Sequence, residues 1–128
     1  MMSCIVTGSG GGLGRYLISE LLENTNRVVI GISRKNSRGL LGPSGSRLIT
    51  IEGDLRDAKF VRDVLSKYAK STLIHCAANW NGFNLDRDIL ENNTSVTLNI
   101  LNNLPNDISR FVYISSAGVY SDGYSTER

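Results

Sequence analysis

Residues 7–14 read Thr-Gly-Ser-Gly-Gly-Gly-Leu-Gly, and this stretch decides the fold. The apolar run Cys4-Ile5-Val6 precedes it, and an amphipathic segment from Leu13 to Leu22 follows it. A strand, a glycine-rich turn and a helix in this order present backbone N–H groups and a helix N-terminus to a diphosphate. The stretch therefore predicts a dinucleotide-binding unit.

The spacing of the glycines narrows the kind of unit. The pattern Gly-x-Gly-x-x-Gly fails, because it would need a glycine at Leu13 or at Arg15. The P-loop pattern fails because no Gly-Lys-Ser/Thr follows the glycines. Thr-Gly-x-x-Gly-x-x-Gly fits, and its fixed positions are Thr7, Gly8, Gly11 and Gly14. A glycine-rich turn that binds nothing is the alternative that the later residues must exclude.

Length and composition bound the class of protein. We expect one NAD(P)-binding domain over residues 1–128, because 128 residues is near the usual size of a domain. The composition, with 41% apolar and 20% charged residues, is that of an ordinary soluble globular protein. The net charge of +2 is too small to favour nucleic acid or an anionic membrane as a partner. No apolar run reaches the roughly 20 residues that span a bilayer, and no signal peptide is recognisable. Cys4 and Cys76 fall at offset positions of two predicted strands, so we expect reduced thiols and a cytoplasmic location.

Apolar strands alternate with helices along the whole chain. The first predicted helix has Leu13, Leu17 and Leu21 at every fourth position, which predicts its buried face. The alternation predicts an α/β fold, a Rossmann-type doubly wound parallel sheet of about five strands, with ligand at the carboxyl ends of the strands. The predicted strands are 3–7, 27–33, 47–52, 72–76 and 110–115, the predicted helices are 13–23, a segment following 57, and 88–104, and the predicted loops are 34–46, 79–87 and 118–128.

The end of the second predicted strand bears on the choice of cofactor. An acidic residue about 20 positions after the glycines would suit the ribose of NAD. This chain has Ser33 there and Arg34 next, with Lys35 and Arg38 close behind. Because a guanidinium can bind a 2′-phosphate through two hydrogen bonds, we favour NADP over NAD. The alternative is that these cations are solvated loop residues.

The third and fourth predicted strands end in residues suited to the rest of a dinucleotide. Asp54 could accept a hydrogen bond from the adenine amino group, with Leu55 against the ring, although Asp54 could instead cap the next helix. The small residues Ala77 and Ala78 would let the cofactor lie close to the strand. The single histidine, His75, is expected to be a packed residue, and no Cys/His cluster with metal spacing surrounds it.

Five motifs in order resemble the cofactor-binding part of an extended short-chain dehydrogenase/reductase, of the NAD-dependent epimerase/dehydratase family. They are Thr7–Gly14, Gly53–Leu55, His75–Ala78, Asn93 with Thr97 and Asn99, and the Ser-Ser-Ala-x-Val-Tyr run at Ser115–Tyr120. The resemblance implies a Rossmann fold, a nicotinamide cofactor and often a nucleotide-sugar substrate. It implies that Ser116 is a catalytic residue that hydrogen-bonds the reacting oxygen. It implies that Asn93, on the predicted helix at 88–104, is a polar residue that is either structural or near the nicotinamide. Gly8, Gly11, Leu13 and Gly14 would then hold the diphosphate.

The chain departs from the family pattern at the catalytic base. Such proteins use a Tyr-x-x-x-Lys pair about two dozen residues or more after the serine, in which the lysine lowers the tyrosine pKa. No such pair occurs in these 128 residues, and Tyr124 with Arg128 is rejected because an arginine does not titrate usefully. We therefore expect the cofactor half of an enzyme, with little turnover by itself. The alternative is a non-catalytic NADP(H)-binding module whose exposed strand edge at 110–115 pairs with a second copy.

Overall fold

The computed structural model describes residues 2–34, 47–79 and 87–116. The chain forms eight elements in these ranges, namely β1 (Ser3–Thr7), α1 (Gly12–Asn24), β2 (Val28–Ser33), β3 (Leu48–Glu52), α2 (Ala58–Lys67), β4 (Thr72–His75), α3 (Arg87–Asn102) and β5 (Arg110–Tyr113). Of the expected loop at 34–46, only residue 34 is described, and of the expected loop at 79–87, only residues 79 and 87. The expected loop at 118–128 lies wholly outside the described residues. Lys35 and Arg38 also lie outside the described residues.

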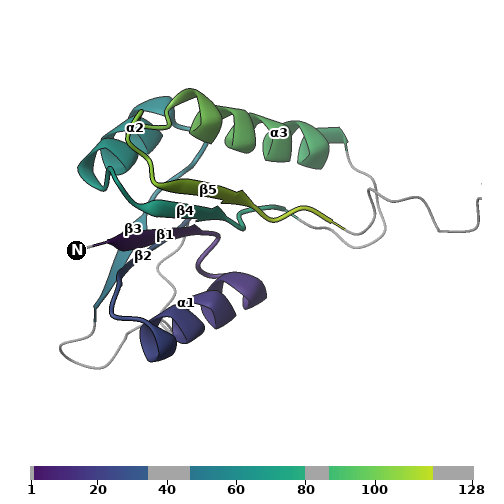
Figure 1. Cartoon of the computed structure of the whole chain (residues 1–128). Helices are drawn as coiled ribbons and strands as arrows, with labels where there is room; N and C mark the ends of the chain where they lie inside the picture. Colours follow the sequence, from purple (N-terminus) through teal and green to yellow (C-terminus); the bar gives the residue numbers. More distant parts are fainter. Residues whose placement is uncertain (1, 35–46, 80–86, 117–128) are drawn as a thin grey trace, which may run out of the picture.

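The five strands form one parallel sheet in the order β3-β2-β1-β4-β5. The chain adds strands in one direction from β1 to β3 and then crosses over to β4 and β5, which is the doubly wound arrangement expected from the sequence. Figure 1 shows α1 on one face of the sheet and α2 with α3 on the other. Both the fold class and the strand count predicted from the sequence are therefore confirmed.

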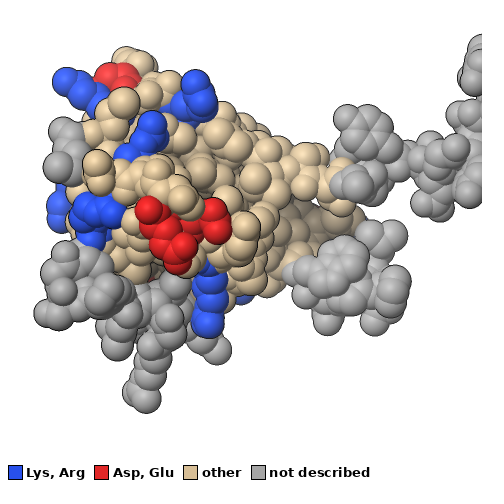
Figure 2. Space-filling view, turned by 60° about the horizontal axis from the view of Figure 1, so that its bottom comes forward, with Lys and Arg blue, Asp and Glu red and all other residues tan. Residues whose placement is uncertain are grey.

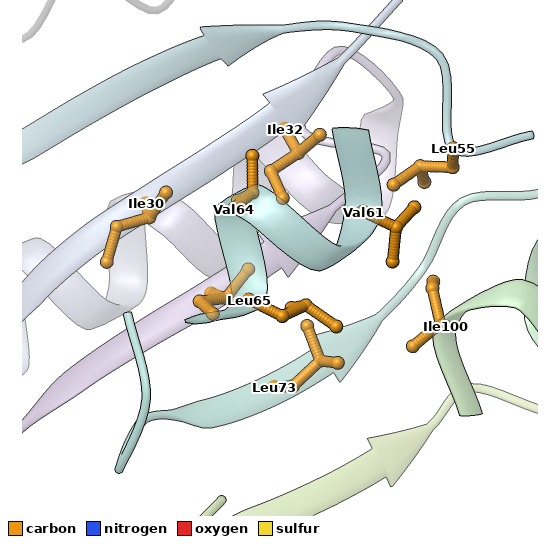
Figure 3. Close-up of a cluster of buried hydrophobic side chains, with 9 residues drawn as sticks. Ile30, Ile32, Leu55, Val61, Val64, Leu65, Leu73 and Ile100 are labelled. Atoms are coloured by element: carbon orange, nitrogen blue, oxygen red, sulfur yellow. The ribbon is translucent and has the colours of Figure 1, made fainter. Parts of the chain in front are cut away.

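Alternate residues of the central strands supply two separate cores. Ile5 of β1 and Ile30 and Ile32 of β2 face α2 and α3, where they pack in a cluster that includes Leu65 and Ile100 (Figure 3). The other face of the same strands packs against α1 in a smaller cluster of Cys4, Val6, Ile18 and Val29. Burial on both faces explains why these strands read as nearly continuous apolar runs.

The buried face of α1 agrees with the leucine spacing only in the second half of the helix, where Leu21 packs against the smaller cluster. The residues that the sheet buries are Gly14 and Ile18, whereas Leu13 and Tyr16 stand out in solvent. The expected Leu13 stripe is therefore wrong at its start. Gly14 decides the rotation of the helix, because this glycine packs against the backbone of the turn before it and so turns Leu13 away from the sheet.

Predicted and observed element ends differ by at most two residues, and the bounds of β1 are the same in both. The largest differences are at the end of α3 and at the end of β5. After Ile100 the helix tightens, because the N–H groups of Asn103 and Leu104 bond to carbonyl oxygens three residues back, and the helix ends before Pro105.

In the described part of the chain, no helix combines the length and the apolar character that a membrane crossing needs.

Charge is mixed on the side of the molecule that carries α1. Figure 2 turns this side forward and shows acidic and basic side chains interspersed, with uncharged residues between them. This face does not present the single-sign field that binds a polyanion.

Candidate functional site

A cavity of about 1060 Å³ opens at the carboxyl ends of the central strands. The loops after β1, β2, β3 and β4 form its walls, and α3 borders it on one side. The residues that line it are Gly8, Gly10, Gly11, Arg15, Ile32, Ser33, Arg34, Gly53, Asp54, Leu55, Arg56, Cys76, Ala77, Ala78, Asn79, Asn92, Asn93 and Val96. The cavity thus lies at the crossover point, where the doubly wound topology leaves room for a ligand.

Two glycines of the turn are required by the fold itself. Gly8 has φ +68°, and a Cβ there would lie 2.8 Å from the backbone of Ala77 after β4. A Cβ on Gly14 would overlap the carbonyl oxygen of Gly8. These residues let the turn, the neighbouring strand end and the start of α1 approach closely.

Gly11 differs from both, because the fold does not require it to be a glycine. Its backbone is extended, with φ −79° and ψ 167°, and a Cβ there would come no nearer than 3.4 Å to another atom. It lines the cavity and is the N-cap of α1, where no side chain among the described residues caps the helix and no acidic residue lies in the first turn. The positive end of the α1 dipole therefore meets the cavity without a counter-charge in its first turn.

The structure brings seven of the residues predicted to bind cofactor into this one cavity. They are Gly8, Gly11, Arg34, Asp54, Leu55, Ala77 and Ala78. Thr7, Leu13 and Gly14 do not line it: Thr7 and Gly14 are buried behind the turn, and the Leu13 side chain is 47% exposed outside it. Ser116, the predicted catalytic residue, is exposed beyond the carboxyl end of β5 and is not part of the cavity lining.

Arginines and one carboxylate set the charge of the cavity. Arg56 forms a salt bridge with Asp54 at 2.6 Å, and its hydrogen bonds hold the pKa of Asp54 down at about 2. Asp54 is therefore a permanent hydrogen-bond acceptor at neutral pH. It does not cap α2, because the N-cap is Asp57, whose carboxylate accepts from the N–H groups of Lys59 and Phe60.

Arg34 is exposed, and its side chain reaches across the carboxyl edge of the sheet. Its Nη2 donates to Oδ1 of Asn79 at 3.1 Å. Arg34 follows β2 and Asn79 follows β4, and β1 lies between these strands, so this bond spans the carboxyl end of β1. The side chain of Asn93 in turn holds the backbone of Asn79. Arg15, Arg56 and Asn79 were not predicted for the site, and no motif of the sequence marks them.

The two cysteines and the histidine agree with what the sequence predicts for them. Cys4 and Cys76 are free thiols, as expected. His75 is buried, as expected for a packed histidine. Within residues 2–34, 47–79 and 87–116, no three His, Cys, Asp or Glu side chains gather in a way that could hold a metal ion.

The sequence relatives of this chain include UDP-glucose 4-epimerases. The chain is 30% identical over 128 residues to the UDP-glucose 4-epimerase of Erwinia amylovora, a match that covers 93% of this chain and 38% of the relative. It is 28% identical over 130 residues to the UDP-glucose 4-epimerase of Klebsiella pneumoniae, covering 94% of each. The chain thus spans well under half the length of the Erwinia protein.

Solved structures with the same fold include proteins with bound NAD. A short-chain dehydrogenase/reductase superfamily protein from Agrobacterium tumefaciens with bound NAD is 27% identical, with a TM-score of 0.75, over 93% of this chain and 34% of that one. The WbmH enzyme of Bordetella bronchiseptica in complex with NAD+ is 26% identical, with a TM-score of 0.75, over 95% of this chain and 42% of that one. The sequence model of the NAD dependent epimerase/dehydratase family matches residues 4–128. The chain therefore belongs to the NAD dependent epimerase/dehydratase family.

Proposed function

We propose that the cavity binds a nicotinamide dinucleotide, and that the chain is the cofactor-binding half of an epimerase, dehydratase or reductase acting on a nucleotide sugar. The observation that carries this proposal is the meeting of seven predicted residues in one cavity at the uncapped N-terminus of α1. The UDP-glucose 4-epimerases among its relatives support the substrate class. A bound nicotinamide would supply the hydride acceptor and donor for such chemistry.

Each part of the dinucleotide has a matching group. The N–H groups at the start of α1, including that of Leu13, would hold the diphosphate, with Gly11 leaving room for it. Asp54 would accept from the adenine amino group and Leu55 would contact the ring. Ala77 and Ala78 would lie under the ribose next to the nicotinamide. Thr7 and Gly14 would act from behind, by holding the turn in shape.

Gly11 provides the sharpest test of the binding proposal, and Gly12 is its matched control. A methyl at Gly11 projects at the cavity wall without a backbone clash, whereas a methyl at Gly12 would meet open space and does not line the cavity. We expect Gly11→Ala to weaken NAD+ or NADP+ binding by about tenfold or more in calorimetric titration, and Gly12→Ala to leave it unchanged. Equal affinity in both variants would contradict the proposed position of the diphosphate.

We favour NADP as the cofactor. Arg34 supports this choice, because its guanidinium lies at the end of β2, where the adenosine ribose would sit, and can exchange Asn79 for a 2′-phosphate. The solved relatives described above hold NAD, so the preference must be measured on this chain. We expect Arg34→Ala to weaken NADP+ binding by about tenfold and NAD+ binding far less. Arg110→Ala, which removes an exposed arginine on β5, is the control; the same result for Arg34→Ala and Arg110→Ala would refute the preference.

Ser116 is proposed as the residue that hydrogen-bonds the reacting oxygen of the substrate. Because these 128 residues contain no Tyr-x-x-x-Lys pair, we expect them to bind cofactor with little turnover of a UDP-sugar. Turnover that persists in Ser116→Ala would overturn the role given to Ser116.

We also propose a cytoplasmic location, which suits the free thiols. Self-association through the β5 edge is proposed as well, and light scattering tests it.

A further inference from the structure

A continuous chain of hydrogen bonds runs behind the cavity, through the only histidine of the sequence. Oγ1 of Thr7 lies 2.6 Å from Nδ1 of His75, and Nε2 of His75 lies 3.0 Å from Oγ1 of Thr97. The hydroxyl of Thr97 donates to the carbonyl oxygen of Asn93 at 3.0 Å. His75 is 1% exposed and does not line the cavity, so it touches no ligand there.

Which atom donates in each hydrogen bond of this network follows from the bonds at its two ends. Oγ1 of Thr7 accepts hydrogen bonds from the N–H groups of Cys76 and Ala77, both at 3.1 Å. A hydroxyl has two lone pairs and one hydrogen, so Thr7 can only donate to His75. Nδ1 of His75 therefore carries no proton. At the other end, Thr97 donates its hydrogen to Asn93 and must accept from His75.

We propose that His75 is a positioning residue, fixed as the neutral Nε2–H tautomer, that joins the glycine-turn wall of the cavity to α3. This inference rests on the proposed dinucleotide function. On one side, His75 orients the Thr7 hydroxyl that holds the N–H of Ala77, the residue against which Gly8 packs. On the other side, it binds Thr97 of α3 one helical turn after Asn93.

The placement of the two ends explains why such a joint matters for binding. Ala77 and Asn93 both line the cavity, and they come from different elements. Thr7 and His75 are direct partners in the pairing of β1 with β4. The hydrogen bonds therefore begin at the carboxyl end of the middle strand of the sheet. The rings of Phe111 and Tyr113 of β5 lie 6.5 and 5.9 Å from the imidazole, centroid to centroid, and flank it.

The tautomer is measured directly on the wild-type chain. Long-range 1H–15N correlation on uniformly 15N-labelled protein at neutral pH reports one imidazole without any assignment, because the sequence has one histidine. We expect an unprotonated Nδ1 and a protonated Nε2. A protonated Nδ1, or an exchange-averaged pair of nitrogens, would overturn the proposal.

Thr97 tests the coupling to the cavity, and Thr94 supplies a matched control because it is an exposed threonine on the same helix. Thr97→Val keeps the side-chain shape but leaves the Nε2–H of a buried ring without an acceptor. We expect it to weaken binding of NADP+ or NAD+ by about tenfold, and Thr97→Ser to restore affinity to within about twofold of wild type. Thr94→Val should leave both the affinity and the imidazole signals unchanged.

The two proposals fail in distinguishable ways. If wild-type protein binds neither NAD+ nor NADP+, the proposed function fails, and the tautomer and its response to Thr97→Val still decide whether the network exists. If wild type binds cofactor and Thr97→Val binds it equally well, the positioning role fails and the proposed function stands. Loss of fold in Thr97→Val leaves Thr97→Ser, whose shorter side chain keeps the hydroxyl and must retain the wild-type tautomer.

Discussion

The side chain of Asn93 forms two hydrogen bonds with the backbone of Asn79: Oδ1 accepts from the N–H at 2.7 Å, and Nδ2 donates to the carbonyl oxygen at 3.0 Å. A side-chain amide that pairs with a backbone N–H and C=O in this way reproduces the two hydrogen bonds that opposite residues exchange between adjacent antiparallel strands. It fixes α3 to the segment that follows β4. Both residues line the cavity, so this pair sets the width of one wall.

Changing Asn93 to aspartate should break half of this pair. The variant keeps an oxygen that accepts from Asn79 N–H, but it presents a second oxygen to the Asn79 carbonyl, where the Nδ2–H donor was. We expect Asn93→Asp to lower the free energy of unfolding by about 1–2 kcal/mol in urea titration. Asn106→Asp adds the same charge at an exposed position away from the cavity and is the control. Equal stability of the two variants would show that the Asn79 contact contributes nothing.

The close approach of Gly14 to Gly8 gives a second prediction. Gly14→Ala places a methyl against a backbone carbonyl that cannot rotate away, so α1 must shift from the sheet. We expect a loss of about 3 kcal/mol in unfolding free energy. Gly12→Ala adds the same methyl in open space at the first residue of α1 and should be neutral or stabilising by up to about 1 kcal/mol. Two variants of equal stability would contradict the packing described for the turn.

Arg47 closes the carboxyl end of α1, and this gives a third prediction. Its Nη1 donates to the carbonyl oxygens of Thr25 and Arg27 at 2.6 and 2.8 Å, and its Nη2 donates to that of Leu22 at 2.7 Å. A cation there also meets the negative end of the helix dipole. We expect Arg47→Ala to lower the unfolding free energy by about 2 kcal/mol and Arg47→Lys to recover only part of it, since an ammonium lacks the planar fork.

The control for this third prediction is Arg62→Ala. Arg62 is exposed, and among the described residues its side chain makes one hydrogen bond, to Asn103 at 3.3 Å, so its loss should change stability by less than about 0.5 kcal/mol. A lysine variant as stable as wild type would mean that charge alone, and not the fork, holds the end of α1.

The fold was predictable from the sequence because its signals are local. Apolar runs such as that at Cys4–Val6 and the glycine spacing at Gly8–Gly14 act through neighbouring residues, and so the strands, the helices between them and the turn followed from them. The rotation of α1 was not predictable from the leucine spacing. Gly14 sets it through a contact with the backbone of Gly8, and a pattern of apolar side chains does not report such a contact.

The candidate site was predictable where a motif marks a strand end, as at Arg34 and Asp54. Contacts between distant segments were not, because they depend on where the loops lead. Asn79 is held at the site by a hydrogen bond to Asn93. Asn79 also accepts a hydrogen bond from Arg34, which lies 45 positions away in the sequence. Thr7 is the first fixed position of the glycine motif, and yet it lies behind the cavity. Its hydroxyl forms hydrogen bonds with His75 and with the backbone N–H groups of Cys76 and Ala77.

The imidazole of His75 should make the stability of the chain depend on pH. Burial lowers the pKa of His75 to about 4 in the folded state, while an unfolded histidine titrates near 6.5. Between these values the unfolded state binds one more proton, so the free energy of unfolding falls as the pH falls. The contribution is complete above about pH 6.5, and its loss reaches about 3 kcal/mol near pH 4.

Denaturant titrations between pH 5 and 6.5 isolate this effect from the carboxylates. Asp54, whose pKa is lowered to about 2 by Arg56, keeps its stabilising charge throughout that window and loses it only in stronger acid. We expect wild type to lose stability steadily across the window and His75→Gln to show a much flatter profile. If the glutamine variant does not fold, NMR titration of the single imidazole in wild type must give a pKa below about 5. Parallel profiles, or an imidazole that titrates near 6.5, would contradict the buried neutral histidine.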